Sequence, residues 1–358
     1  MKTKTCIIFS TRPEIIKLFP IIKYLNKKKK NFFFLNTGQH YDFDLHKIFF
    51  DQFQMKKAKY NLKKNKLNGN DYIADCLKFI NKILIKEKPT HVIVQGDTDT
   101  TLCGSLATNI YNRGKSVKQK IKLFHVEAGL RSYDENMPEE INRKIVDNLS
   151  EYLFVPTKFE LNNLKKENLF KFKKIRVVGN TILESLKILE KKNPIKYAKK
   201  NYFLLTLHRP ETVDNKKNFL KLLVNLNNIA SKFKTIILFP IHPRSKKKIS
   251  SKDISKLNLI RIVKPVDYLK FILFLKSSKL VLTDSGGIQE ECYILNKPCV
   301  TIRENTERQI TTFNKSNIVS GYNISKIEKS IKYLLNKKIK NKNIFGKNIS
   351  KKIVSEIR

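Results

Sequence analysis

The sequence predicts an α/β protein with two Rossmann-like domains, each built on a parallel sheet. Short apolar segments rich in Ile, Val and Phe alternate with longer segments of helical periodicity, a pattern typical of parallel sheets covered on both faces. The alternation occurs in two successive series along the chain. With 358 residues, 41% of them hydrophobic, the chain can bury a core in each of two domains.

The two series define the expected strands and the boundary between the domains. The expected strands of the first series are residues 5–9, 32–36, 91–95, 121–126, 152–156 and 175–178. Those of the second series are residues 202–207, 235–240, 259–263, 279–283 and 298–302. The segment VVGNT at 177–181 is the expected hinge, because a strand ends there and a helix begins. We therefore expect domains at 1–178 and 179–344, followed by a helix within 345–358 that could pack back on the N-terminal domain.

The charge of the chain first suggests a polyanionic partner. Lys and Arg number 73 against 31 Asp and Glu, for a formal net charge of +42, which would attract nucleic acid or an anionic membrane surface. Most of these residues are lysines, however, and they are scattered or lie in short runs rather than in one stripe. We therefore expect no nucleic-acid partner. A lysine-rich nucleic-acid-binding protein is the alternative from another class, and it would leave the acidic motifs described below without a role.

The cysteines and the apolar segments predict the compartment. The five cysteines form no C-x-x-C pair and stand in apolar surroundings, as expected for buried, reduced thiols in a cytoplasmic protein. The apolar run near the N-terminus is too short for a signal peptide. No apolar stretch approaches the roughly 18 to 20 residues needed to cross a bilayer. We expect a cytoplasmic protein that has no membrane partner.

Polar motifs follow the expected strands, where an open α/β sheet binds its ligands. Histidines of the chain at such places are His40, His125, His208 and His242. The motif TDSGGIQEE at 283–291 follows a strand and opens a helix, so its backbone N–H groups and the helix dipole could hold a phosphate. Glu291, one helical turn further on, could accept the hydroxyls of a ribose. An ordinary strand-to-helix turn is the alternative interpretation.

The motifs that the chain contains and lacks indicate which kind of nucleotide it would bind. The chain contains neither G-x-G-x-x-G nor G-x-x-x-x-G-K-[ST], so we expect no dinucleotide cofactor. The remaining option is a nucleotide-linked substrate, bound with help from Arg12, Lys17 and Arg308, whose cationic groups suit phosphate oxygens. Each of these three could instead be a surface cation.

Acidic side chains and a histidine form the second group of candidates. Asp97 in QGDTDTT and Glu127 in HVEAGLR each follow an expected strand, and Glu139 and Glu140 follow Pro138 at a helix start. Carboxylates near His208 of TLHRPE could divide into acid and base roles. Alone, Asp97 could cap a helix, and one glutamate of the pair could only compensate the helix dipole. We expect no metal, because no His or Cys cluster has ligand spacing.

Taken together, the motifs resemble those of a known family, the non-hydrolysing UDP-N-acetylglucosamine 2-epimerases. The resemblance extends in order over nearly the whole chain, through STRPEIIK, TGQHYD, QGDTDTT, HVEAGLRS, MPEEINR, VVGNT, LHRPE, TDSGGIQEE and RENTERQIT. It implies a glycosyltransferase-B-like architecture with the active site in the interdomain cleft, a cytoplasmic homodimer and no cofactor. It also implies interconversion of UDP-GlcNAc and UDP-ManNAc for surface polysaccharides.

The resemblance also implies roles for single residues. Those on the nucleotide side would be Arg12 and Lys17 at the diphosphate, Ser285, Gly286 and Gly287 around the phosphates, Glu291 at the ribose, Arg308 at a phosphate and Phe271 near the uracil. Those in the catalytic positions would be Asp97, Glu127, Glu139 and His208. The family's route eliminates UDP to give a 2-acetamidoglucal and then adds it back, which requires acids and bases near both faces of C2.

Three other enzymes remain as alternatives. A glycosyltransferase of the same architecture would share the sheets and the nucleotide site, but it would not require so many carboxylates in the N-terminal domain. A hydrolysing epimerase would release ManNAc and UDP. An epimerase of a UDP-2,3-diacetamido uronic sugar would perform the same chemistry on a different sugar.

Overall fold

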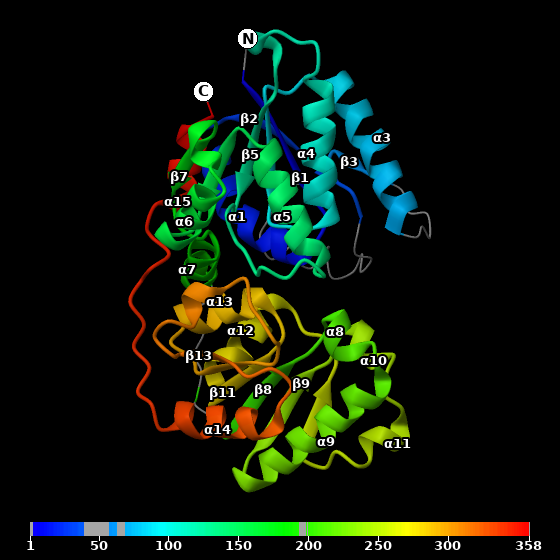
Figure 1. The fold of residues 1–358 in the computed structure, drawn as a ribbon, viewed down its shortest axis with the longest axis vertical. Helices are drawn as coiled ribbons and strands as arrows, with labels where there is room; N and C mark the ends of the chain where they lie inside the picture. The colour runs from blue at the N-terminus through cyan, green and yellow to red at the C-terminus, as the bar shows by residue number, and fades with distance from the viewer. Residues whose placement is uncertain (1–2, 39–56, 63–68, 193–197, 199, 358) are drawn as a thin grey trace. The chain divides into compact units, whose positions relative to one another are not determined.

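The computed structural model describes residues 3–38, 57–62, 69–192, 198 and 200–357. The chain divides into two compact units (Figure 1), which we describe separately. Unit 1 contains Met1–Ile188 and Ile344–Arg358, and unit 2 contains Leu189–Asn343. The TGQHYD motif continues past residue 38, so His40 lies outside the described residues.

Unit 1 contains a parallel sheet of seven strands in the order β3-β2-β1-β4-β5-β6-β7. The strands are β1 (Lys4–Phe9), β2 (Asn31–Asn36), β3 (Tyr60–Asn61), β4 (His91–Gln95), β5 (Lys122–Val126), β6 (Tyr152–Val155) and β7 (Lys174–Val177). Strand β4 is buried along its whole length, as expected for a central parallel strand that has helices on both faces. The strands expected in the first series are confirmed, and β3 is an addition.

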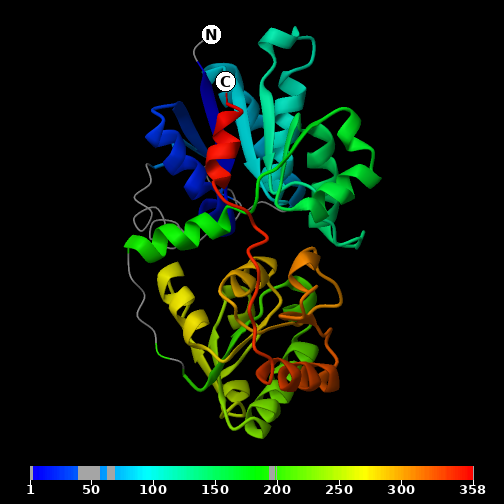
Figure 2. The ribbon, with the colours of Figure 1, turned by 90° about the vertical axis from the view of Figure 1, so that its left-hand side faces the viewer.

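Helices cover both faces of this sheet. They are α1 (Arg12–Lys27), α3 (Gly69–Glu87), α4 (Asp99–Tyr111), α5 (Pro138–Leu149), α6 (Lys158–Lys166), α7 (Ile182–Lys192) and α15 (Ile349–Ser355), with short 3₁₀ turns η1 (Val117–Gln119) and η2 (Leu169–Lys171). Helices α3, α4 and α5 lie side by side and bury one face in a common core (Figure 1). Helix α15 packs beside α1, so the chain ends on unit 1 (Figure 2).

Unit 2 contains a second parallel sheet, of six strands in the order β10-β9-β8-β11-β12-β13. The strands are β8 (Tyr202–Thr206), β9 (Ile236–Pro240), β10 (Ile260–Val263), β11 (Leu280–Thr283), β12 (Cys299–Thr301) and β13 (Asn317–Val319). The helices are α8 (Pro210–Val213), α9 (Lys216–Lys232), α10 (Pro243–Lys246), α11 (Ser251–Ile254), α12 (Tyr268–Ser277), α13 (Gly286–Ile294) and α14 (Ile324–Leu335), with the 3₁₀ turn η3 (Gln309–Thr311).

Strand β8 shows how the sequence builds two cores in unit 2. Phe203 and Leu205 belong to a cluster that includes apolar residues of α9 and α14. Tyr202 and Leu204 belong to a cluster with residues of α12 and α13 on the other face. Successive residues of a strand point to opposite faces, so a continuous apolar strand serves both cores. The prediction of two Rossmann-like sheets is confirmed.

The division of the chain lies after the expected hinge at 177–181. Most of α7 belongs to unit 1, whose first segment ends at Ile188 rather than at residue 178. On α7, Ser185 Oγ donates a hydrogen bond of 2.5 Å to the carbonyl of Ile16. The carboxylate of Glu184 accepts bonds of 2.8 and 3.0 Å from the backbone N–H groups of Ile349 and Ser350. These contacts attach α7 to unit 1, and they could not be inferred from the local sequence.

The cysteines are all buried and free, as the sequence predicted. Within the described part of the chain, none of the helices is both long enough and apolar enough to span a membrane.

Gly179 lies in the connection between β7 and α7, at a position that requires a glycine. Its φ is +112°, and a methyl group there would overlap the carbonyl oxygen of Phe345. We expect Gly179→Ala to lower the free energy of unfolding, measured by urea titration, by at least about 3 kcal/mol, because it combines backbone strain with overlap. Exposed Gly114, at φ +69° with open space around it, is the matched control, and Gly114→Ala should cost about 1 to 2 kcal/mol. Equal losses would contradict the close approach.

His91 makes unit 1 sensitive to acid. Burial, together with the charges of Lys122 and Lys30, lowers the pKa of His91 from about 6.5 to about 4. Between these two values the unfolded chain binds a proton that the folded chain does not, so stability is lost as the pH falls below about 6.5. We expect the wild type to lose about 2 to 3 kcal/mol more than His91→Phe between pH 7 and pH 4.5 in urea titrations. Parallel losses in the two proteins would rule out His91 as the sensitive group.

Candidate active site

In unit 1 the candidate acids lie where neighbouring strands end. Strands β4 and β5 are paired in register, with Gln95 opposite Val126. Asp97 follows β4 and Glu127 follows β5, so the sheet brings the two residues to the same edge. This confirms the placement expected from the sequence; the catalytic roles remain predictions.

Glu127 is held in a strained backbone conformation. Its φ is +73°, which is unfavourable for a residue that has a Cβ. Its carboxylate is nearly buried, and it lies 2.5 Å from Nζ of Lys17 on α1 and accepts a second bond from the amide of Gln95. The structure thus pairs Lys17, expected near the diphosphate, with Glu127. A cation this close favours the ionised form of a carboxylate.

Asp97 is paired with a guanidinium and does not cap α4. Its Oδ2 lies 2.8 Å from Nε and 2.6 Å from Nη2 of Arg143 on α5. The N-cap of α4 is Thr98, whose side chain accepts from the backbone of Thr101. The sequence reasoning missed Arg143, although a guanidinium one helical turn after Glu139 is a detectable signal.

The two glutamates at the start of α5 have different environments. Glu140 is fully buried and accepts bonds of 2.9 and 3.1 Å from the backbone of Ser132 and Tyr133 and 2.6 Å from Arg143 Nη1. It therefore holds the preceding loop. Glu139 is half-buried, so it is the member of the pair that stays a candidate for proton transfer.

The start of α1 is tied to the same edge of the sheet. Glu14 accepts bonds from the backbone N–H groups of Ser10 (2.9 Å) and Thr11 (2.5 Å), and from the hydroxyl of Thr98 (2.7 Å). Burial raises the pKa of Glu14, although these hydrogen bonds oppose the shift. Arg12 occupies the exposed first position of α1.

In unit 2, His208 lies against a buried carboxylate. Asp284 follows β11, is fully buried and accepts bonds of 2.8 and 2.9 Å from the backbone N–H groups of His208 and Arg209. His208 Nδ1 lies 3.3 Å from Asp284 Oδ1, and its ring lies 5.3 Å from that of His242. Burial raises the pKa of Asp284, although these hydrogen bonds oppose the shift. The sequence reasoning missed Asp284, although it lies inside the TDSGGIQEE motif, two residues before Gly286.

The expected phosphate site lies at the start of α13. Ser285 is the N-cap, and Gly286 and Gly287 are the first helical residues. A methyl group at Gly286 would overlap Oε1 of Glu307, whereas one at Gly287 would meet no atom within 4 Å. Of the two glycines, Gly286 is therefore the one that lies against a neighbouring side chain. The dipole and N–H groups of such a helix start favour an anion.

Charged residues lie close behind this helix start. Arg308 is nearly buried, with Nη1 3.2 Å from Oε1 of Glu290. The carboxylate of Glu307 lies 2.9 Å from Arg303 Nη1 and 3.7 Å from Arg308 Nε. Arg308 is therefore held by two carboxylates beside α13.

The residues expected around the nucleoside come from α12 and α13. Glu291 is buried, and its Oε1 accepts a bond of 2.7 Å from the hydroxyl of Tyr268. Phe271, one turn along α12 from Tyr268, packs partly buried against the core that α12 and α13 share. The structure thus brings Phe271 and Glu291 to the same side of the sheet, and their ligand contacts remain predictions.

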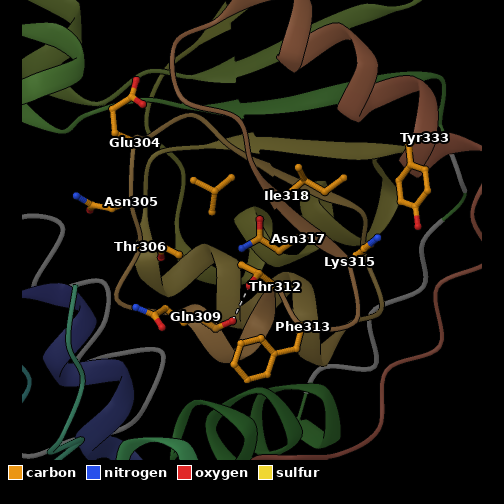
Figure 3. A pocket seen from close by; sticks show the side chains of 11 residues that line it. Glu304, Asn305, Thr306, Gln309, Thr312, Phe313, Lys315, Asn317, Ile318 and Tyr333 are labelled. Carbon is orange, nitrogen blue, oxygen red and sulfur yellow. Dashed lines mark hydrogen bonds between the residues drawn. The ribbon is translucent and has the colours of Figure 1, made fainter. Parts of the chain in front are cut away.

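A cavity of about 710 Å³ lies elsewhere in unit 2, beside edge strand β13 (Figure 3). Its lining includes Phe313, Tyr333 and Gln309, but none of the residues expected at the phosphates or the ribose. We therefore do not assign the nucleotide to this cavity. Among the residues that the structure describes, no group of three or more His, Cys, Asp or Glu could hold a metal ion.

Comparisons with known proteins identify the family of this chain. The family model of UDP-N-acetylglucosamine 2-epimerase matches residues 23–358. A UDP-N-acetylglucosamine 2-epimerase of Methanococcus maripaludis is 45% identical, over 99% of this chain and 98% of that protein. A UDP-2,3-diacetamido-2,3-dideoxy-D-glucuronate 2-epimerase of Pseudomonas aeruginosa is 37% identical, over 85% of this chain and 84% of that protein.

Solved structures give the same result. The UDP-GlcNAc 2-epimerase of Methanocaldococcus jannaschii, in complex with UDP-GlcNAc and UDP, is 43% identical with a TM-score of 0.89, over 99% of each chain. A structure of Phytolacca americana UGT2 is 11% identical to this chain, with a TM-score of 0.57, and the match covers 100% of this chain and 94% of that one. It shows a likeness of fold alone. The expected glycosyltransferase-B-like fold is confirmed, and the chain belongs to the UDP-N-acetylglucosamine 2-epimerase family.

Proposed function

We propose that this protein interconverts UDP-GlcNAc and UDP-ManNAc by reversible epimerisation at C2, without net hydrolysis. The observation that carries the proposal is the pair of carboxylates at the ends of β4 and β5, each beside a cation. Asp97 lies against Arg143, and Glu127 lies against Lys17. Two carboxylates at one edge of a sheet, with Glu139 nearby on α5, are the groups that proton transfer at a carbon requires.

The proposed chemistry balances without a cofactor. A carboxylate removes the proton from C2, the bond between C1 and the diphosphate oxygen breaks, and UDP leaves as a 2-acetamidoglucal forms. In the return step a protonated acid delivers a proton to the other face of C2, and the diphosphate oxygen bonds to C1 again. We assign the proton transfers to Asp97, Glu127 and Glu139, with His208 as a further acid–base group.

The diphosphate must be stabilised when it leaves as an anion. We assign this task to the start of α13, at Ser285, Gly286 and Gly287, together with Arg308 and Arg12. Lys17 also acts on the carboxylate of Glu127, because its Nζ lies 2.5 Å from that group. Glu291 would accept the ribose hydroxyls and Phe271 would lie near the base.

We also infer a cytoplasmic homodimer. Its support is the family resemblance together with the five buried, free cysteines, which suit a reducing compartment. Light scattering of the purified protein tests the dimer.

Incubation with UDP-GlcNAc in deuterated water, followed by NMR, tests the reaction. Because the acid that returns a proton to C2 exchanges its proton with the deuterated water, we expect both UDP-sugars to appear with deuterium at C2. The same incubation with a UDP-2,3-diacetamido uronic sugar should give less exchange. Accumulation of free ManNAc would indicate a hydrolysing enzyme, and the absence of exchange at C2 would refute epimerisation.

Replacement of single carboxylates tests the assigned roles. Asp97→Asn and Glu127→Gln should each lower kcat by about 100-fold or more, the scale of losing one positioned acid or base. In Asp97→Asn, UDP affinity measured by calorimetry should stay nearly constant because the phosphate contacts are assigned to other residues.

Glu135→Gln is the matched control for these variants. Glu135 lies in the loop that leads into α5, but its side chain is 85% exposed and lies 3.3 Å from Nζ of Lys144. This variant should keep normal turnover. If Asp97→Asn or Glu127→Gln turned over normally as a folded protein, the corresponding carboxylate would have only a structural role.

A further inference from the structure

A buried histidine connects the core of unit 1 to the turn that carries Asp97. His125 lies on β5 and is fully buried. Its Nδ1 lies 2.7 Å from Oδ1 of Asp147 on α5, and its Nε2 lies 2.8 Å from the carbonyl oxygen of Gly96. The ring therefore spans the space between α5 and the end of β4.

Both partners of the ring can only accept hydrogen bonds. A backbone carbonyl has no proton to donate, and neither does an ionised carboxylate. Asp147 is held in the ionised form: its Oδ2 lies 2.8 Å from Arg131 Nη1 and accepts a bond of 3.1 Å from Gly129 N–H. Burial raises the pKa of Asp147, but His125 and Arg131 outweigh burial and leave the pKa below its ordinary value.

Donation from both nitrogens requires the imidazolium form of His125. A neutral imidazole has one N–H, so one of the two contacts would join two acceptors. Charged groups of both signs surround the ring. Asp147 and Glu167 supply two negative charges and Arg131 supplies one positive charge, through contacts of 2.7 and 2.8 Å. Half-buried Lys173 is a further cation near Asp147, so the imidazolium is assigned from the two acceptors and not from a count of charges.

The contact at Nε2 acts on the backbone next to a catalytic candidate. Gly96 has φ +77°, and its N–H donates a bond of 3.1 Å to the carbonyl of Val126. Its carbonyl is bonded by His125, so both sides of this residue are fixed to β5. Asp97, the next residue, takes its direction from this turn.

We propose that His125, as an imidazolium oriented by Asp147, is a positioning residue that fixes the Gly96–Asp97 turn for proton transfer at C2. The inference rests on the proposed function through the role of Asp97. If the ring lost its proton, Asp147 would keep the remaining N–H, and the carbonyl of Gly96 would lose its donor. The carbonyl of Gly96 would then no longer be fixed to β5, and the carboxylate of Asp97 would shift against Arg143.

The protonation of the ring is tested first, by NMR of the wild-type protein with ¹⁵N-labelled histidine. At pH 8 an ordinary histidine is neutral and shows one protonated and one unprotonated nitrogen. We expect one histidine to keep both nitrogens protonated. Its signal should be changed by Asp147→Asn and left in place by His91→Phe. Neutral rings throughout at pH 8, or retention of the signal in Asp147→Asn, would overturn the proposal.

Turnover is tested next, with His125→Asn and the matched control His91→Phe. Both histidines are buried in the same sheet, but His91 lies at the opposite end of β4. We expect His125→Asn to lower kcat about 10- to 100-fold with UDP affinity unchanged, since a small misplacement of a reacting group has this effect. His91→Phe should retain normal kcat.

The outcomes separate this inference from the proposed function. If the wild type failed to epimerise UDP-GlcNAc, the proposed function would fail, whereas the NMR measurement would still report on His125. If the wild type epimerised UDP-GlcNAc and folded His125→Asn had the same kcat, the positioning role would be overturned. Should His125→Asn not fold, Asp147→Asn takes its place in the turnover assay, with the same expected loss.

Discussion

Compensation of buried negative charge is the constraint on which the site in unit 1 depends. The buried carboxylates in question are those of Glu14, Glu127, Glu140 and Asp147. An ionised carboxylate removed from water is tolerated only when it is paired or accepts several hydrogen bonds. Two of them find partners on other elements: Lys17 comes from α1 for Glu127, and His125 comes from β5 for Asp147. Glu140 is held by Arg143 of its own helix and by the loop before it. Meeting this constraint fixes the ends of the strands to α1 and α5, so the geometry of the site is set together with the fold.

The same constraint explains how an acidic site exists in a chain of net charge +42. Among the described residues of unit 1, the buried acids outnumber the buried lysines and arginines, which are Lys17, Arg131 and Arg143. The excess of lysine therefore belongs mainly to the surface, where Lys29, for example, is exposed in a turn. A lysine on the surface is strongly hydrated and adds little to the arrangement of the interior. Net charge thus says little about the chemistry of this site.

The sequence predicted those parts that depend on local patterns. Apolar alternation placed the long strands to within a residue or two, and motifs after the strands placed Asp97, Glu127 and the start of α13. Strands β3 and β13 were missed because two or three residues carry no periodicity. The exact division of the chain depends on contacts of α7 with α1 and α15, which are distant in sequence. The pairing of Lys17 with Glu127 was missed for the same reason.

The strained backbone at Glu127 shows what the site retains at a cost in stability. A glycine would adopt φ +73° without strain, and the left-handed conformation costs another residue roughly 1 to 2 kcal/mol. A glycine, however, would remove the carboxylate that Lys17 and Gln95 hold. These two contacts, together with the bond of 3.0 Å from the Glu127 N–H to the carbonyl of Phe154, offset the strain. A side chain kept in an unfavourable conformation by partners on three other elements is more readily explained by chemistry than by packing. Gly96, at the end of the neighbouring strand β4, has a similar φ without strain because it has no side chain. The two turns therefore differ: the one at Glu127 keeps a side chain despite the strain, and the one at Gly96 does not.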